Sequence, residues 1–368
     1  MSAPALEIPT FSPAAPSPHF IRELPILVIF PHSRCNCRCV MCDIWRIRQV
    51  REITLADLEG HLSSLRQLKV RWVVFSGGEP LMHSHLPLLA RLLRGEGIRT
   101  TLLTAGLILA QHAAAVAEHM DDIIVSLDGP PEVHDRIRGL AGAYHRLEKG
   151  IQACRRHRAS ISIHGRCTIQ KENFRHLSTL VRAAHQLKLD SLSFLAADLA
   201  SEAFNRAAPW QPERMSRVAL NAAEVEEFHL HVAALIRDFP REITAGFIRE
   251  NPDKLWRIVE HFRAHLGQVP PMAPRCNAPW VSAVIESDGS VRPCFFHRPF
   301  GRIQDGTLAE IVNNPEAIRF RSQLDVSGNA VCQKCVCSLY HDSGPLAAQA
   351  DKGIRQPAME RKPTAPSL

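Results

Sequence analysis

The chain has 368 residues, of which 45% are hydrophobic and 22% charged, and its net charge is +7. These values are ordinary for a globular protein and leave room for one large α/β domain with a smaller module. The longest apolar runs are far short of the about 20 residues that a membrane span needs, and residues 1–23 lack the basic and apolar regions of a secretory signal. The excess of Lys and Arg is scattered, which argues against a nucleic-acid-binding stripe. We therefore expect a cytoplasmic protein whose partners include neither membrane nor nucleic acid.

Short apolar runs alternate with amphipathic stretches from residue 24 to about 200. Strands are expected at 26–31, 72–76, 100–104, 122–127, 160–169 and 191–196. Helices are expected between them, at 55–68, 85–94, 110–120, 143–156 and 174–188. Most of the strands are apolar nearly throughout, as strands are when helices cover both faces of a parallel sheet. Six successive βα units predict a parallel α/β barrel, open or closed, with its ligand site at the carboxyl ends of the strands.

Changes in composition divide the rest of the chain. We expect a flexible N-terminal arm over 1–23, the barrel over 24–200, a helical connecting segment over 201–270, a small α+β module over 271–342 and a disordered tail over 343–368. The small module is expected to contain a hairpin with strands at 280–285 and 291–293, followed by a helix at 309–324.

Four cysteines crowd the loop after the first strand, in the pattern C-x-C-x-C-x-x-C from Cys35 to Cys42. In a reducing compartment, such thiols indicate metal binding or redox catalysis before they indicate disulfides. Three thiolates on one tight loop can hold three corners of a [4Fe–4S] cube and leave the fourth iron without a protein ligand. An open coordination position is typical of a catalytic site. The alternative is a zinc site made by all four thiols, or by three of them with His32.

Polar groups follow several of the other strands. The second strand ends in the sequence SGGEP at 76–80, where the glycines let backbone approach a ligand and Glu79 offers an acceptor to a cation. A Gly-Gly pair at a strand end is also common in ordinary turns. The fourth strand ends in VSLDG, where Ser126 can contact a ligand and Asp128 can cap a turn. Arg166 on the fifth strand can bind a carboxylate, and a structural role for it is equally open.

Together, the CxxxCxxC subset of the cysteine loop and the GGEP turn resemble the radical S-adenosylmethionine (SAM) superfamily, whose core is a partial (β/α)6 TIM-like barrel. The resemblance implies that Cys35, Cys39 and Cys42 hold a [4Fe–4S] cluster, which leaves Cys37 as a bystander. The open iron of that cluster would chelate SAM, and one electron would cleave SAM to a 5′-deoxyadenosyl radical. The electron would come from a donor of the flavodoxin or ferredoxin type. The resemblance also implies SAM contacts at Gly77, Gly78, Glu79, Pro80, Ser126 and Arg166.

The chain departs from the family pattern at two positions. Met41 stands before the last cysteine of the loop, where the family usually has an aromatic residue, and Ala105 stands where it often has Asn. A thioether would then replace ring stacking on adenine. Neither departure removes a ligand.

Five further cysteines gather in the C-terminal module: Cys276, Cys294, Cys332, Cys335 and Cys337. Two of them bracket the expected hairpin, and a CxxC pair follows the last helix. The layout resembles the auxiliary-cluster module of SPASM and twitch radical SAM proteins, in the shorter twitch form. The resemblance implies one auxiliary [4Fe–4S] cluster on the first four of these cysteines, with Cys337 as the substitute. A tetrahedral zinc site is the alternative. A cluster closed by four thiolates would transfer electrons.

We expect a radical SAM enzyme of the oxidoreductase type, which abstracts hydrogen from a small polar metabolite in a biosynthetic pathway and oxidises or rearranges it. The second hypothesis is a maturase that modifies a peptide or protein side chain, although residues 1–23 are too few for a leader-binding domain. The third is a zinc- or iron–sulfur-binding protein without turnover. Asp198, Glu202 and Arg206 follow the sixth strand and can face a polar substrate, although the start of an amphipathic helix would show the same pattern.

Overall fold

The computed structural model describes residues 17–206 and 210–342. Most of the expected arm and the expected tail from Ser343 lie outside these ranges. The last residues of the expected arm pack against the C-terminal module. Ile21 is 2% exposed, and its backbone N–H donates to Asn313 Oδ1 at 2.6 Å. Within the described residues, none of the helices combines the length and the apolar character needed to cross a membrane.

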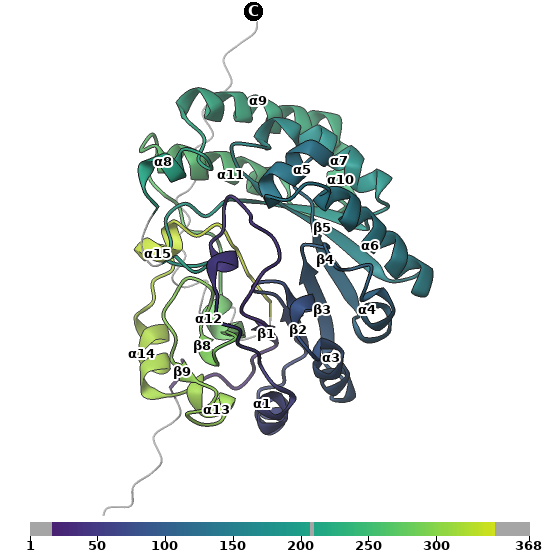
Figure 1. The fold of residues 1–368 in the computed structure, drawn as a ribbon. Helices are drawn as coiled ribbons and strands as arrows, with labels where there is room; N and C mark the ends of the chain where they lie inside the picture. Colours follow the sequence, from purple (N-terminus) through teal and green to yellow (C-terminus); the bar gives the residue numbers. More distant parts are fainter. Residues whose placement is uncertain (1–16, 207–209, 343–368) are drawn as a thin grey trace, which may run out of the picture.

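A nine-stranded sheet in the order β6-β5-β4-β3-β2-β1-β7-β8-β9 forms the centre of the molecule (Figure 1). Strands β1 to β6 are mutually parallel and form the expected partial (β/α)6 barrel. Their bounds are Ile26–Ile29, Trp72–Phe75, Arg99–Thr104, Asp122–Ser126, Ser162–Ile169 and Ser191–Ala196. Each expected strand is therefore found, because a fully buried parallel strand leaves an apolar run in the sequence.

The C-terminal strands extend this sheet instead of forming a separate one. Strand β7 (Ser282–Ile285) pairs in parallel with β1, with Ile26 opposite Ser282. Strands β8 (Ser290–Arg292) and β9 (Gly301–Arg302) continue the sheet in antiparallel pairing. The hairpin was expected, but its attachment to the first strand was not, since pairing between distant segments leaves no local signal.

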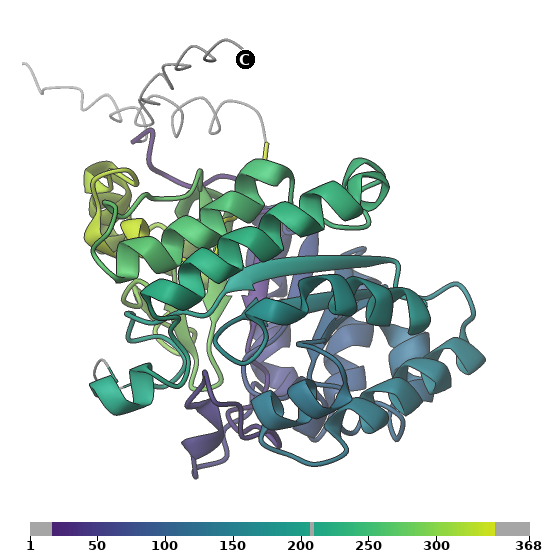
Figure 2. The same ribbon diagram turned by 90° about the horizontal axis from the view of Figure 1, so that it is seen from above.

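Helices cover the outer face of the barrel, and α9 and α11 lie side by side over the β6 end of the sheet (Figure 2). The helices of the barrel are α1 (Leu55–Gly60), α2 (Leu62–Gln67), α3 (Leu86–Gly95), α4 (Ala113–His119), α5 (Pro131–Arg138), α6 (Ala143–His157) and α7 (Leu177–Gln186). The connecting segment contains α8 (Pro212–Met215), α9 (Ala222–Asp238), α10 (Pro240–Thr244) and α11 (Pro252–His265). The C-terminal module contains α12 (Ala278–Val281), α13 (Leu308–Ile311), α14 (Pro315–Gln323) and α15 (Ala330–Gln333). Short 3₁₀ helices are η1 (Ile44–Arg46), η2 (Pro80–Met82) and η3 (Phe174–His176).

Two expected helices are each divided, and three helices were not expected: α5 in the barrel, and the single-turn helices α12 and α15 in the C-terminal module. The helix expected at 55–68 breaks at His61, whose ring Nε2 lies 3.1 Å from the Ile303 carbonyl oxygen of the C-terminal module. The helix expected at 309–324 becomes α13 and α14, and Asn314 caps the second of them. Helix α5 was missed because its sequence begins with two prolines and is rich in charge.

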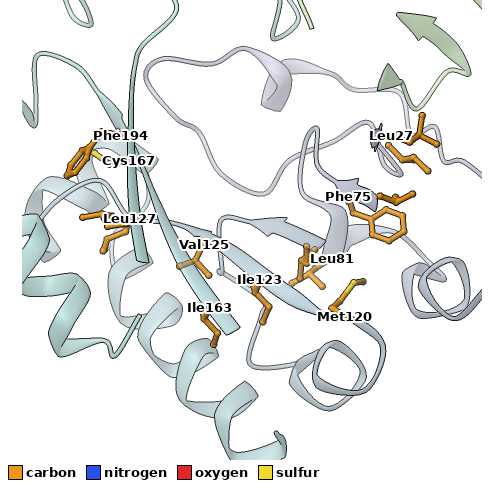
Figure 3. Packing of buried hydrophobic residues seen from close by; sticks show 14 of the residues in the cluster. Leu27, Phe75, Leu81, Met120, Ile123, Val125, Leu127, Ile163, Cys167 and Phe194 are labelled. Atoms are coloured by element: carbon orange, nitrogen blue, oxygen red, sulfur yellow. The ribbon is translucent and has the colours of Figure 1, made fainter. Parts of the chain in front are cut away.

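The main core lies between the barrel strands and the outer helices, as Figure 3 shows. Ile123, Val125 and Leu127 follow the pleat of β4 and its carboxyl end, and each is 0% exposed. Burying one such side chain contributes about 1.5–3 kcal/mol to stability. Ser126 points to the opposite face of the sheet, where polar groups can meet a ligand.

Candidate functional site

The first cysteine group lies on the loop between β1 and α1, the purple segment in the middle of Figure 1. Cys37 and Cys39 are buried in a small cluster with Ala105, which follows β3, and with Ala143 at the start of α6. Cys35 and Cys42 are partly buried at its edge. The loop therefore lies over the carboxyl ends of the strands, where a parallel barrel binds its ligands.

The thiols of this loop have different tendencies to ionise. A hydrogen bond from Cys37 lowers the pKa of the Cys39 thiol to about 7, although burial acts in the opposite direction. Hydrogen bonds to Cys35 and Cys39, followed by burial, raise the pKa of the Cys37 thiol. Burial raises the pKa of Cys42 to about 12. Because a thiolate is the form that binds metal, Cys39 is more ready to become a ligand than Cys37 or Cys42.

The GGEP turn is in direct backbone contact with the cysteine loop. The Glu79 N–H donates to the Arg34 carbonyl oxygen at 2.9 Å. A Cβ atom on Gly78 would lie 2.2 Å from that same oxygen. Gly77 has a φ of +98°, and a Cβ there would lie 2.5 Å from the ring of Phe30. Both glycines are therefore needed for the loop and the turn to pack together.

The Glu79 side chain is completely buried beside the loop, at 0% exposed. Its carboxylate accepts hydrogen bonds from Thr104 Oγ1 at 2.8 Å, from the Ala105 N–H at 2.9 Å and from the Leu81 N–H at 3.1 Å. Burial raises the pKa of this carboxyl group, and the three hydrogen bonds act against that rise. The turn is thus fixed at the site, and the contact of Glu79 with the amino group of SAM stays a prediction.

The register of the two strands brings Ser126, the last residue of β4, beside Arg166, which lies in the middle of β5. They are directly opposite each other in the parallel register, so both side chains are on the same face of the sheet. Arg166 is exposed, and its Nε lies 3.4 Å from Ser193 Oγ on β6. The guanidinium is thus available at the site, and the SAM contacts of both residues stay predictions.

The polar residues after β6 have a structural role, which was one of the two interpretations that the sequence left open. Arg206 forms an ion pair with Asp198 at 2.9 Å, and both side chains are buried. Arg206 also donates to the Met41 carbonyl oxygen at 3.1 Å and stacks on the Trp210 ring at 3.9 Å from its centroid. This buried pair holds the cysteine loop in place, while Glu202 is exposed.

The five C-terminal cysteines also lie near one another. The thiols of Cys276 and Cys294 each raise the pKa of Cys332, Cys335 and Cys337, in addition to the larger effect of burial. Cys335 Sγ donates to the Cys337 carbonyl oxygen at 3.0 Å. The choice between Cys335 and Cys337 as the fourth ligand stays a prediction.

Two polar residues near this second group were not singled out from the sequence. His297 Nε2 lies 3.5 Å from Cys332 Sγ. Asn277 is 0% exposed; its side-chain nitrogen donates to the His341 carbonyl oxygen at 2.8 Å, and its Oδ1 accepts from the His341 N–H at 3.0 Å. Asn277 therefore ties the segment that carries Cys276 to the segment that follows Cys337.

The chemistry of both thiol groups suits iron–sulfur clusters. All eleven cysteines are free. Over 17–206 and 210–342, no three His, Cys, Asp or Glu side chains converge as they would around a single metal ion. A four-iron cube carries its irons at separate corners, so its thiolate ligands stand apart from one another. Cysteine thiolates are the usual ligands of four-iron clusters, and each group supplies enough cysteines to hold one.

A cavity of about 790 Å³ lies between the end of β6, helix α11 and residues 333–336 of the C-terminal module. Its apolar lining includes Leu195, Met215 and Ile258, and its charged lining includes Glu250, Lys254, Arg257 and Lys334. Burial raises the pKa of the Glu250 carboxyl to about 7. The sequence did not predict this cavity, because the residues of α11 form no recognisable motif. They line the cavity only because α11 packs beside β6.

Family models match two separate parts of the chain. The model of the radical SAM superfamily matches residues 29–184, and that of an iron–sulfur cluster-binding domain, SPASM, matches residues 276–336. The first range contains the first cysteine group and the GGEP turn, and the second contains four of the five C-terminal cysteines.

Curated relatives have several activities. Fe-coproporphyrin III synthase of Methanosarcina barkeri is 24% identical over 305 residues, which cover 78% of this chain and 73% of the relative. PqqA peptide cyclase of Xanthomonas axonopodis pv. citri is 24% identical over 362 residues, which cover 92% and 88%.

Among solved structures, that of Streptococcus suis SuiB bound to S-adenosylmethionine superposes with a TM-score of 0.60 at 16% identity, covering 87% of this chain and 73% of SuiB. At this identity the likeness shows a common fold.

Proposed function

The chain belongs to the radical SAM superfamily and carries a SPASM iron–sulfur domain, and we propose that it reductively cleaves SAM and uses the resulting 5′-deoxyadenosyl radical to take hydrogen from a substrate. The observation that carries the proposal is the packing of the cysteine loop directly on the GGEP turn at the carboxyl ends of the strands. Cys35, Cys39 and Cys42 would hold the cluster that binds SAM. That cluster would supply the electron for cleavage, received from a flavodoxin- or ferredoxin-type donor in a reducing cytoplasm.

The residues around the loop would orient SAM. Gly77 and Gly78 keep the turn flat against the loop, and Pro80 begins η2 and so fixes the direction in which the chain leaves it. Glu79 would accept from the amino group of SAM. Ser126 and Arg166 would bind its ribose or carboxylate oxygens from the neighbouring strands β4 and β5.

We place the substrate in the cavity beside β6. Its volume of about 790 Å³ is within the range of small-molecule sites. The lining carries three cations, from Lys254, Arg257 and Lys334, against the two carboxyl groups of Glu250 and Glu260. Together with the apolar side chains, this excess of cations suits an apolar molecule that carries acidic groups. This differs from the small polar metabolite expected from the sequence. The activity named for the Methanosarcina relative makes an acidic tetrapyrrole the first candidate.

The second cysteine group would take an electron from the substrate radical and so complete an oxidation. The position of Cys337 supports this role, because the charge of Arg166 on β5 acts on its thiol. The auxiliary cluster would thus face the barrel interior, next to residues that we assign to SAM. Cys276, Cys294, Cys332 and Cys335 remain the proposed ligands.

A peptide maturase is the second candidate, because PqqA peptide cyclase is similar over 92% of this chain. The two candidates differ in what should stimulate turnover. If the substrate is an acidic tetrapyrrole, a tetrapyrrole that carries carboxylate side chains should increase 5′-deoxyadenosine formation; Fe-coproporphyrin III itself is what the Methanosarcina relative is named for making. If the chain is a maturase, a peptide substrate should increase 5′-deoxyadenosine formation, and the tetrapyrrole should not.

The decisive experiment is anaerobic reconstitution, reduction with dithionite, and quantification of 5′-deoxyadenosine and methionine. We expect both products from the wild type and neither from a variant with Cys35, Cys39 and Cys42 changed to Ala. A matched triple variant at Cys154, Cys167 and Cys37, which removes three thiols that we do not assign to iron, controls for the loss of thiols in general. Lack of 5′-deoxyadenosine from wild type that contains iron and sulfide would refute the proposal.

A further inference from the structure

Arg138 connects the cysteine loop to a buried carboxylate. It is the last residue of α5 and is 7% exposed. Its Nη1 donates to Cys39 Sγ at 3.5 Å, and its Nη2 forms an ion pair with Asp128 Oδ2. One guanidinium thus lies between a proposed cluster ligand and a carboxylate that is 0% exposed.

The position of Arg138 relative to Cys39 is fixed by the backbone. The Arg38 N–H donates to the Arg138 carbonyl oxygen at 2.9 Å, and the Val40 N–H donates to the Ile137 carbonyl oxygen at 3.1 Å. These two hydrogen bonds come from the residues directly before and after Cys39. They satisfy carbonyl groups at the end of α5 that have no partner within the helix.

Asp128 is held from its other side. Its Oδ1 accepts from the Thr168 N–H at 3.1 Å, and Asn173 Nδ2 donates to its backbone carbonyl oxygen at 3.0 Å. The neighbouring His134 is a neutral group at neutral pH, since burial, followed by the charge of Arg138, lowers its pKa to about 4. The formal charges beside Cys39 are therefore the Arg138 cation and the Asp128 anion.

A buried arginine cannot release its charge as a buried lysine can, so the cation next to Cys39 is permanent. If the guanidinium served only to neutralise Asp128, its second nitrogen would not need to point at a sulfur atom. Charges and hydrogen bonds at the ligand sulfurs are among the factors that set the potential of an iron–sulfur cluster.

We propose that Arg138 is a positioning residue that raises the reduction potential of the SAM-binding cluster through Cys39, and that Asp128 moderates this effect. Reduction adds a negative charge to the cluster, and a nearby cation with an N–H group on a ligand sulfur stabilises that charge. The carboxylate of Asp128 offsets part of the cation. The inference rests on the proposed function, since it takes Cys39 to be a ligand.

The test is an EPR-monitored redox titration of the reconstituted full-length protein. Addition of SAM identifies the open cluster, because only its signal should change. Arg138→Met should shift the midpoint of that signal to a more negative potential, by at least about tenfold in the redox equilibrium, which is 59 mV for one electron. Asp128→Asn keeps an acceptor for Thr168 and should shift the midpoint in the positive direction. Opposite shifts are the signature, since general loosening of the site would not produce them.

Arg136→Met is the matched control. Arg136 is on the same helix but is 58% exposed in its side chain and pairs with Glu172 at 3.2 Å, so both midpoints should remain unchanged. If the Met variant does not fold, Arg138→Lys, which keeps the positive charge, tests the effect of Arg138 on the cluster. Its midpoint potential should shift in the negative direction by less than that of Arg138→Met. Unchanged midpoints in Asp128→Asn and in either Arg138 variant would overturn this inference and leave the proposed function intact. Lack of a SAM-sensitive signal in the wild type would overturn both.

Discussion

Cys37 and Cys39 are two residues apart on one loop, yet the pKa values of their thiols shift in opposite directions. The hydrogen bond from Cys37 lowers the pKa of Cys39 to about 7. Cys37 is 1% exposed and is more readily kept in its protonated form, because its hydrogen bonds and its burial raise its pKa. A protonated thiol donates a hydrogen bond and does not bind iron.

We therefore predict that Cys37→Ser keeps most of the rate of SAM cleavage, since a hydroxyl can also donate. Cys39→Ser should reduce the rate by more than the about 100-fold that changes around a metal ligand typically cost. The measurement is the initial rate of 5′-deoxyadenosine formation by reconstituted protein. Equal losses in the two variants would show that Cys37 is also a ligand.

Glu250 is an ionisable residue of the cavity whose titration should affect stability. Its Oε2 accepts from the Phe194 N–H of β6 at 2.8 Å. The carboxyl oxygen thus takes the place of the backbone carbonyl oxygen that a neighbouring strand would supply. Burial raises its pKa from 4.5 to about 7, and the cations of Lys254 and Arg166 act against that rise. Between about pH 4.5 and about pH 7, the Glu250 carboxyl group therefore binds its proton more tightly in the folded state than in the unfolded state.

The sign of the pH dependence follows from this difference in proton binding. The contribution of Glu250 is most favourable below about pH 4.5 and is lost as the pH rises to about 7. Glu250→Gln should remove this part of the slope, as measured by urea unfolding midpoints at about pH 5 and about pH 8. Glu260→Gln, which changes an ion-paired carboxylate of the same cavity, is the control. An unchanged slope in Glu250→Gln would contradict the assignment.

At the scale of elements, the cysteine loop is held between the GGEP turn and the end of α5. Gly139 follows α5 with a φ of +63°, and a Cβ there would lie 2.6 Å from the Arg38 carbonyl oxygen. Gly142 has a similar φ of +76°, but a Cβ there would have no atom within 4 Å. A substitution at Gly142 therefore measures the cost of backbone strain alone. A substitution at Gly139 measures that cost together with the cost of displacing the loop.

We predict that Gly142→Ala lowers the free energy of unfolding by about 1 kcal/mol through its left-handed conformation alone. Gly139→Ala should lower it further and should also reduce the iron content, because the loop must move away from Arg38. Denaturant unfolding and iron analysis measure the two effects. If both variants bind iron as the wild type does, the contact between α5 and the loop is not needed for cluster binding.

The sequence predicted the elements whose signal is local. The apolar runs of β1 to β6 and the spacing of Cys35, Cys39 and Cys42 are such signals. Helix α5 was missed, and with it Arg138, because two prolines and a high charge resemble a loop. The break at His61 was missed because it depends on contacts with Ile303 and with the Leu308 N–H, which lie far away in the sequence.

At the scale of the whole molecule, the two cysteine groups belong to one continuous sheet. Strand β7 pairs with β1, so the C-terminal module is attached directly to the strand that precedes the first cysteine loop. No pattern in the sequence indicates this pairing, since either segment could pair with other strands. The proposed electron transfer between the second group and the substrate depends on this arrangement.

The central claim is that the chain holds two separate four-iron clusters, and iron and sulfide analysis of anaerobically reconstituted protein tests it most directly. We predict about eight iron and eight sulfide per wild-type chain. Changing Cys35, Cys39 and Cys42 to Ala should leave about half, and so should changing Cys276, Cys294, Cys332 and Cys335 to Ala. Zinc with little sulfide in the wild type, or loss of all iron on changing the first group alone, would contradict the account.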